Sequence, residues 1–411
     1  MTNLNRRGFS KLAIAVAATA RGLRAFSSNS KIDDTLRSGM ERRKIPALTA
    51  SVATPDKIIY QGAFGTRDGE SGVKVAVDSI FAIASMTKAI TSTAALQLVD
   101  QGKVTLDEPV AKHIPDFAKL QVLDGFDAAG KPVLRPVRTA VTLRHLLTHT
   151  SGLCYDTWSE EMVKYEKATG MSVGLGTAPL VPLMIEPGSR WQYGYSTDWA
   201  GRLVEVVSGM SLEAYFRKNI LDPLGMQDTT FAFPATKFDR LVTRYDRQPD
   251  GALKQVTRAM PATPAVFNGG GGLYSTAVDY TKFTQMILRH GRGEGGVQIL
   301  QPKTVAAMSS NQIGALSAGK LKTQRPAISS DVDVHPGALD KWGLGFLINT
   351  VPYPGGRSAG SLAWAGIDNT FYWIDPKRQL SAVIMMQFLP FVDKEAVAML
   401  SEFEKAVYAT Q

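Results

Sequence analysis

The spacing of apolar and polar residues divides the chain into two regions of β pattern with a longer helical region between them. Near the amino end, β-branched and aromatic residues predict strands over 47–52 and 57–65, joined by the turn Thr54-Pro55-Asp56. Near the carboxyl end, short segments of the same kind, separated by Pro, Gly and Asp, predict strands over 343–349, 361–365, 369–374 and 380–387. Apolar residues at helical spacing predict helices over 32–43, 86–101, 142–148 and 394–408, and one that ends at Gly209.

This order predicts an α/β protein of the α+β type. One antiparallel sheet is built from both chain ends and flanked by helices, and a mostly helical region is inserted between its strands. We expect the sheet part to use about 30–85 and 340–411, and the helical part about 86–339. The least regular segment, 315–336, is predicted to be a loop. An active site is expected where the two parts meet.

Composition narrows the function classes. The chain has 411 residues, of which 44% are hydrophobic and 20% charged, which is ordinary for a globular protein with a sizeable core. The net charge of +9 includes three cations within residues 1–20, and the only other notable basic run is Arg42-Arg43-Lys44. We therefore predict no nucleic-acid partner.

The amino terminus resembles a Tat export signal. Arg6 and Arg7 precede a short apolar run over 12–20 that ends in Ala18-Thr19-Ala20, a plausible cleavage site. We expect residues 1–29 to be signal and linker, the Tat machinery to bind them before maturation, and the mature chain at 30–411 to be periplasmic or secreted. The alternative is an ordinary N-terminal helix. No segment approaches about 20 apolar residues, so no stable membrane span is expected.

Ser85 and Lys88 are the first candidates for chemistry. They lie one turn apart where the second predicted helix begins, so the lysine can reach the serine hydroxyl. Backbone N–H groups at the helix start would face an oxyanion on the acylated carbonyl. Serine needs an adjacent base, which a lysine can supply only if it is held partly neutral. The same pattern also occurs as an N-capping serine with a solvated lysine, so context must decide.

Two further motifs supply that context. A phenolate at Tyr193, stabilised by the Lys88 cation, could take the serine proton and return it to the leaving group, although an isolated tyrosine is more often part of a core. Trp364-Ala365-Gly366 predicts a strand end at which a glycine lets a substrate approach the backbone.

Together these motifs resemble the serine β-lactamase and penicillin-binding protein superfamily, over about 32–408. The segments 143–153, 186–188 and 269–276 resemble further landmarks of that superfamily in the expected order. A class C lactamase would carry Y-x-N and K-T-G. This chain lacks the asparagine after Tyr193 and the lysine before Gly366, and that lysine helps to hold a substrate carboxylate.

These departures resemble the family VIII carboxylesterases and the fungal acyl transesterases. The resemblance implies that Ser85 is the nucleophile, that Lys88 helps to activate it and that Tyr193 is the general base and acid. It also implies an oxyanion hole from the N–H groups of Ser85 and Ile367, with no metal and no cofactor. Tyr195 is a rival base because Tyr195-Ser196-Thr197 fits a loose Y-S-x, but the spacing from Tyr193 to Asp198 and Gly201 fits the esterases better. We expect substrate contacts from Trp364, Gly366, Tyr195 and Asp198, the last also orienting its neighbours.

We therefore predict a serine hydrolase that cleaves small-molecule carboxylic esters, short-chain or neutral in their acyl part, through an acyl-Ser85 intermediate. One alternative is a β-lactamase or D-Ala-D-Ala carboxypeptidase in which Arg357 or Arg378 replaces the missing lysine. A second is acyl transfer to an alcohol. A third, a non-catalytic sensor, would have lost the serine or the lysine.

Several other residues are predicted to be structural. His145 and His149 have the i, i+4 spacing of zinc ligands, but no glutamate follows His145 and no third ligand is evident. Glycines 269–272 lack the G-K-[S/T] ending of a phosphate loop and fit close backbone packing. Cys154 is the single cysteine, so no disulfide can form within the chain, and we expect a buried apolar residue.

Overall fold

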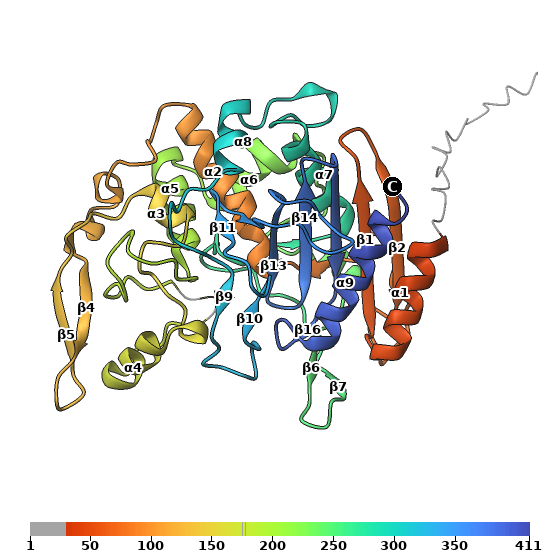
Figure 1. Cartoon of the computed structure of the whole chain (residues 1–411), viewed down its shortest axis with the longest axis horizontal. Coiled ribbons are helices and arrows are strands. Elements are labelled where there is room, and N and C mark those ends of the chain that lie inside the picture. Colours follow the sequence, from red (N-terminus) through yellow and green to blue (C-terminus); the bar gives the residue numbers. More distant parts are fainter. Residues whose placement is uncertain (1–29, 175, 177) are drawn as a thin grey trace, which may run out of the picture.

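A computed structural model describes residues 30–174, 176 and 178–411. The export signal and its cleavage site, predicted within 1–29, lie outside these residues. The main sheet is antiparallel and has the strand order β11-β12-β13-β14-β15-β1-β2, as Figure 1 shows. Its strands are β1 (Ala47–Ala53), β2 (Ile58–Gly65), β11 (Lys341–Trp342), β12 (Leu347–Ile348), β13 (Leu362–Gly366), β14 (Thr370–Asp375) and β15 (Leu380–Met385). The prediction of one antiparallel sheet assembled from both chain ends is confirmed.

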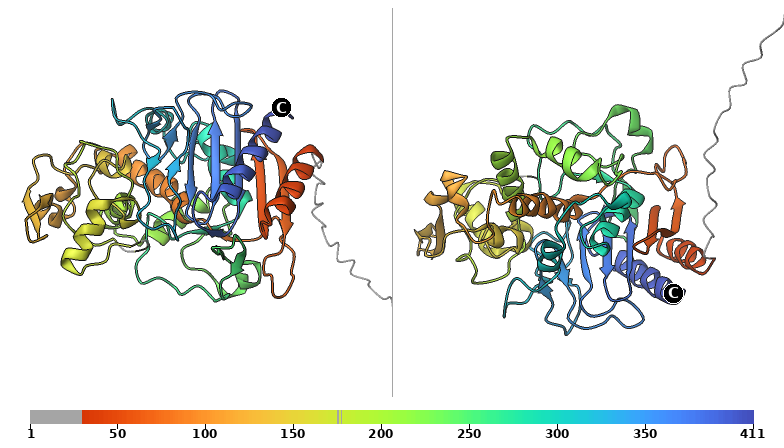
Figure 2. Two further views of the ribbon diagram at one scale, coloured as in Figure 1. Left: turned by 60° about the horizontal axis from the view of Figure 1, so that its bottom comes forward. Right: turned by 90° about the horizontal axis from the view of Figure 1, so that it is seen from above.

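Strand β1 joins the two ends of the chain. It pairs with β2 on one side and with β15 on the other, in the register Thr49↔Met385 to Ala53↔Ser381. All seven residues of β1 are buried, because helices cover both faces of the sheet. One face carries α1 (Ser30–Arg43) and α9 (Lys394–Tyr408), which pack on each other, and the other carries α7 (Ala277–Leu288), as Figure 2 shows.

Two sequence-based assignments were wrong in detail. Of the strand predicted over 343–349, only Leu347–Ile348 (β12) is a strand, and β11 precedes the predicted span, because the glycines between the two strands pack against other parts of the chain. A Cβ at Gly343 would lie 2.1 Å from the Met308 carbonyl oxygen, and a Cβ at Gly345 would lie 2.5 Å from Ser92 Oγ. Helix α7 was not predicted, because its buried positions include polar residues such as Asp279, Thr284 and Gln285, which a pattern of apolar residues does not count.

The helical region is built around α2 (Thr87–Asp100). Every residue of α2 from Thr87 to Leu98 is buried, and α5 (Ser196–Ser208) and α6 (Leu212–Phe216) pack on it. The other helices are α3 (Leu143–Leu147), α4 (Glu160–Thr169) and α8 (Pro302–Met308). Small outer sheets are formed by β4 (Gln121–Phe126) with β5 (Pro132–Pro136), by β6 (Tyr245–Arg247) with β7 (Leu253–Gln255) and β16 (Phe388–Leu389), and by β9 (Lys320–Leu321) with β10 (Val332–Asp333). In the part of the chain that the structure describes, no helix is both long and apolar enough to cross a membrane.

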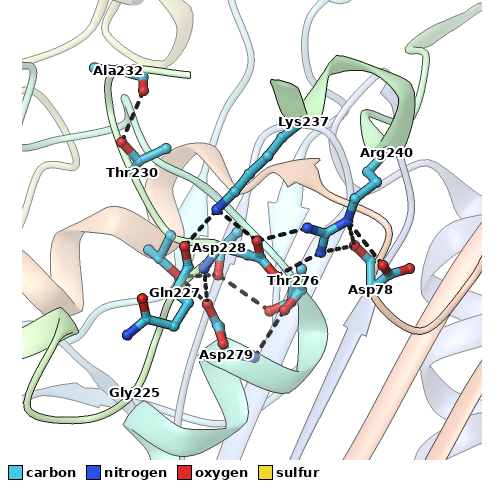
Figure 3. A network of polar contacts seen from close by, with 12 residues as sticks. Asp78, Gly225, Gln227, Asp228, Thr230, Ala232, Lys237, Arg240, Thr276 and Asp279 are labelled. Carbon is cyan, nitrogen blue, oxygen red and sulfur yellow. Dashed lines mark hydrogen bonds and ion pairs between the residues drawn. The ribbon is translucent and has the colours of Figure 1, made fainter. Parts of the chain in front are cut away.

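A network of polar contacts lies beside β3 (Phe81–Ala82), the strand that precedes α2. Strand β3 pairs with β8 (Tyr274–Ser275), and Figure 3 shows the side chains beside this pair. Arg240 donates two hydrogen bonds to the Asp228 carboxylate, at 2.8 and 2.6 Å, and two to the Asp78 carbonyl oxygen, at 3.0 and 2.6 Å. The Asp228 N–H donates to Asp279 in α7 at 2.7 Å. The turn before β3, the 228–240 segment and the start of α7 are therefore held together.

Candidate active site

Ser85 lies on a sharp turn between β3 and α2. We expected the helix to start near Ser85, but α2 begins at Thr87, and Ser85 belongs to the short 3-10 helix η1 (Ala84–Met86). The reason is Ala84, whose φ of 42° lies in the left-handed region that most residues avoid. The turn leaves Ser85 half-buried, whereas Lys88 on the next turn is only 1% exposed. The serine is therefore reachable, and the lysine lies beneath it.

The Lys88 amine has three polar contacts. Its Nζ lies 3.1 Å from Ser85 Oγ, 2.5 Å from the Gly270 carbonyl oxygen and 3.4 Å from the Tyr155 hydroxyl. The same nitrogen lies 4.9 Å from the ring centre of Tyr193, within the range of a cation–π contact. Lys88 thus touches the serine and two tyrosine side chains at once.

Tyr193 is held by the tryptophan of strand β13. The Trp364 Nε1–H donates a hydrogen bond to the Tyr193 hydroxyl at 3.0 Å, and the two side chains are 6% and 2% exposed. A donor aimed at a phenol oxygen favours its phenolate form. The sequence pointed to Trp364 as a substrate contact, and in the structure its indole nitrogen is engaged with Tyr193.

Two other tyrosines, Tyr155 and Tyr195, lie near Tyr193, and their hydroxyl groups differ in hydrogen bonding. The Tyr155 hydroxyl contacts Lys88, whereas the Tyr195 hydroxyl has no hydrogen-bond partner among the described residues. Burial, followed by the nearby Asp198, raises the pKa of Tyr155 well above its usual value, and burial does the same for Tyr195. Sequence reasoning missed Tyr155, whose one signal was its position directly after the 143–153 landmark.

The end of β13 comes against the turn that carries Ser85. A Cβ at Gly366 would lie 2.3 Å from the Ile83 carbonyl oxygen, so only glycine allows this approach. Gly366 is thus required by a contact with the protein's own backbone, where the sequence suggested a contact with substrate. Ile367 follows Gly366 directly and is half-buried.

Asp198 and the glycine run lie on the far side of Lys88. Asp198 Oδ1 accepts a hydrogen bond from the Gly270 N–H at 3.1 Å, and its Oδ2 is buried without a hydrogen-bond partner in the described part of the chain. Burial raises the pKa of Asp198, and the charge of Lys88 opposes this shift. The sequence analysis treated Asp198 as a substrate contact or an orienting residue, and its carboxylate is engaged with Gly270.

The two histidines and the cysteine have surroundings that suit structural roles. His145 Nδ1 accepts the Thr142 N–H at 3.2 Å and so caps α3. The His149 ring lies 4.6 Å from the Tyr193 ring, and burial, followed by the charge of Lys88, lowers its pKa well below the usual value. Cys154 is fully buried, and burial raises the pKa of its thiol. No group of three or more metal-ligating side chains occurs within the described ranges.

The two arginines considered as replacements for the missing lysine are elsewhere. Arg357 is 4% exposed and forms a buried ion pair with Glu404 of α9, with Nη2 and Oε2 2.6 Å apart. Arg378 follows β14 and lies over the Tyr408 ring at 5.9 Å. In the register Leu362↔Ile374, the turn after β14 that carries Arg378 lies beside the start of β13, whereas Gly366 is at the other end of that strand. The suggestion that either arginine takes the place of the lysine was therefore wrong.

Comparisons with known proteins concern the family and the overall fold of the chain. The model of the β-lactamase family matches residues 32–402. The chain is 31% identical over 412 residues to ML-236A carboxylate methylbutanoyltransferase of Penicillium citrinum, with 96% of each chain covered. It is 30% identical over 408 residues to lovastatin esterase of Penicillium rubens, with 92% of this chain and 98% of the relative covered. Among solved structures, a variant of simvastatin synthase from Aspergillus terreus superposes with a TM-score of 0.80 at 32% identity, covering 92% of this chain and 94% of the other. The superfamily resemblance drawn from the sequence motifs is confirmed.

Proposed function

Because the chain belongs to the β-lactamase family, we propose that it is a serine enzyme that cleaves carboxylic esters by taking the acyl group onto Ser85. The observation that carries this proposal is the Lys88 amine, which lies 3.1 Å from Ser85 Oγ and over the ring of Tyr193. A buried amine in contact with both a serine and a tyrosine supplies what an otherwise weak hydroxyl nucleophile needs.

The proposed reaction has two matched halves. Tyr193, with its oxygen held by Trp364 and its ring beneath Lys88, takes the Ser85 proton as Ser85 Oγ attacks the ester carbonyl. The backbone N–H groups of Ser85 and Ile367 hold the negative oxygen of the tetrahedral intermediate. Tyr193 then gives the proton to the leaving alkoxide, and the C–O bond breaks to leave acyl-Ser85 and an alcohol. An acceptor hydroxyl repeats the sequence in reverse and frees the serine.

The surroundings of Trp364, on strand β13, favour a neutral substrate. A carboxylate of a penicillin or a peptide would need a cation near Trp364, and the two arginines considered for that role lie elsewhere. Aromatic rings surround Tyr193 instead, with Trp158, Trp191 and Trp364 between 4.9 and 6.3 Å from its ring centre. These surroundings support short-chain or otherwise uncharged acyl groups.

Transfer of the acyl group to an alcohol is the second candidate. It is favoured by the similarity to a methylbutanoyltransferase over 96% of both chains. The chemistry of the first half is the same, and the outcome depends on whether water or a bound alcohol reaches acyl-Ser85 first.

A comparison of p-nitrophenyl butyrate with nitrocefin tests the proposal. The wild-type protein should cleave the ester with a much higher kcat/KM than the lactam, and Ser85→Ala should abolish ester cleavage. Ser92→Ala is a matched control, since the buried Ser92 hydroxyl lies on α2 and has no hydrogen-bond partner among the described residues. Adding a primary alcohol and measuring new ester against free acid gives the share of transfer. Ester cleavage that survives in Ser85→Ala would refute the proposal.

A further inference from the structure

Asp198 reaches the catalytic lysine through one residue of the glycine run. The Gly270 carbonyl accepts a hydrogen bond from Lys88 Nζ at 2.5 Å, and the N–H of the same residue donates to Asp198 Oδ1 at 3.1 Å. A Cβ at Gly270 would lie 2.1 Å from Asp198 Oδ2, so the glycine packs directly on the carboxylate. The aspartate, the glycine and the lysine therefore form one continuous contact between α5 and α2.

The neighbouring residue fixes the same strip of backbone. The Gly269 carbonyl accepts a hydrogen bond from Thr91 Oγ1 at 2.6 Å, and a Cβ at Gly269 would lie 3.0 Å from the Thr197 carbonyl oxygen. Backbone held on both sides in this way can present its next carbonyl to Lys88 at a fixed place.

Among the polar groups that face Lys88, Asp198 supplies a carboxylate. The polar groups that face the amine come from four parts of the chain, and they are the Ser85 hydroxyl, the Gly270 carbonyl, the phenols of Tyr155 and Tyr193, the imidazole of His149 and the carboxylate of Asp198. Burial keeps His149 neutral, and it raises the pKa of Tyr155 well above its usual value. A cation that is 1% exposed is costly unless a negative charge lies near it.

Asp198 and Lys88 also interact through their charges. Burial raises the pKa of Asp198, and the lysine charge opposes that rise.

Building on the ester-cleaving function proposed above, we propose that Asp198 is a positioning residue that acts through Lys88. Through the Gly270 peptide it holds the Lys88 amine in place beside Ser85 and Tyr193. Lys88 then serves as the cation that supports the Tyr193 phenolate, and Tyr193 removes the Ser85 proton. A different account is that Asp198 is only an acidic residue in the first turn of α5, where the helix dipole favours it.

Two substitutions separate charge from position. Asp198→Asn removes the negative charge but keeps an oxygen that can accept the Gly270 N–H, and Asp198→Ala removes both. Glu205→Gln is the matched control, because Glu205 also lies on α5 and accepts a backbone N–H, that of Leu212 at 2.9 Å. Two readouts are measured, namely kcat and KM for p-nitrophenyl butyrate and the rate at which a fluorophosphonate labels Ser85.

Removing the acceptor should displace the Gly270 carbonyl and with it the Lys88 amine. Asp198→Ala should therefore lower kcat and the labelling rate of Ser85 by about 10-fold or more, with KM little changed. Asp198→Asn should keep most of both rates, because its amide oxygen can still accept the Gly270 N–H, and Glu205→Gln should match the wild type. Rates of Asp198→Ala equal to those of the wild type would overturn the proposal. So would an equal loss in Asp198→Asn and Asp198→Ala, because the charge of Asp198 and not the position of Gly270 would then decide the rate.

Failure of the underlying function gives a different pattern. In that case the wild-type protein would not cleave the ester, or Ser85→Ala would still cleave it, whatever the Asp198 variants do. The labelling rate of Ser85 still compares the wild type with Asp198→Ala when no ester is turned over.

Discussion

Replacing Trp364 with phenylalanine removes one hydrogen bond from the proposed base and leaves an aromatic ring in its place. The bond is the Nε1–H to Tyr193 hydroxyl contact of 3.0 Å, between side chains that are 6% and 2% exposed. A hydrogen bond to a charged acceptor contributes about 1.5–3 kcal/mol. At about 1.4 kcal/mol for each factor of ten, its loss should lower kcat/KM by about 10- to 100-fold.

The expected loss lies in kcat rather than in KM, because the indole N–H contacts the proposed base. The assay is hydrolysis of p-nitrophenyl butyrate, with urea unfolding measured on the same preparations.

Trp191→Phe provides a closely matched control. Trp191 is also 6% exposed and its ring stacks on Tyr193 at 6.3 Å, but its indole N–H has no hydrogen-bond partner among the residues that the structure describes. Both substitutions should cost similar stability, because each removes the same atoms from a buried site. If Trp364→Phe and Trp191→Phe change kcat/KM equally, the indole hydrogen bond has no part in the reaction.

Three more predictions follow from buried groups. Burial raises the pKa of Asp368 to about 6, so its neutral form stabilises the fold at low pH, and that stability is lost as pH rises from about 4 through 6. Asp368→Asn should flatten this pH dependence and raise the unfolding free energy by about 3 kcal/mol at pH 7. Urea unfolding at pH 4.5 and 7.5 measures both effects. An equal pH dependence in both proteins would contradict this prediction. Glu404→Gln leaves the Arg357 cation buried without its ion-pair partner. It should lower the unfolding free energy by about 3–5 kcal/mol and leave kcat/KM unchanged. A loss of unfolding free energy below about 1 kcal/mol would show that the ion pair is not essential for stability. Tyr193→Phe should abolish ester turnover and Tyr195→Phe should not, and the reverse result would make Tyr195 the base.

The sequence predicted those elements whose pattern is local. Helix α9 has the predicted bounds, 394–408, because it has one apolar face and begins directly after Asp393, whose side chain caps it. Helix α7 was missed because several of its buried residues are polar, among them Asp279, Thr284 and Gln285. A pattern of apolar residues therefore finds a helix less readily where polar side chains share the core.

The same distinction applies to the site. Ser85 and Lys88 are three residues apart, so their contact depends on one turn of backbone. Tyr155 and Gly270 reach Lys88 from 67 and 182 residues away, and their approach depends on how α2, α5 and the loops pack together. Neither residue was assigned to the site from the sequence, and 269–276 was named only as a landmark of the superfamily, with its glycines assigned to close backbone packing.

The placement of β1 between β2 and β15 sets the order in which the molecule can be completed. The chain makes β1 and Ser85 early, but the partner strand of β1 is residues 380–385 and the other half of the oxyanion hole follows Gly366. Contacts between residues so distant in sequence form slowly, because a long loop must close first. A nascent chain that already displays its serine therefore still lacks the strand that finishes the sheet, and we expect the proposed acylation of Ser85 to become possible only when the last part of the chain has been made.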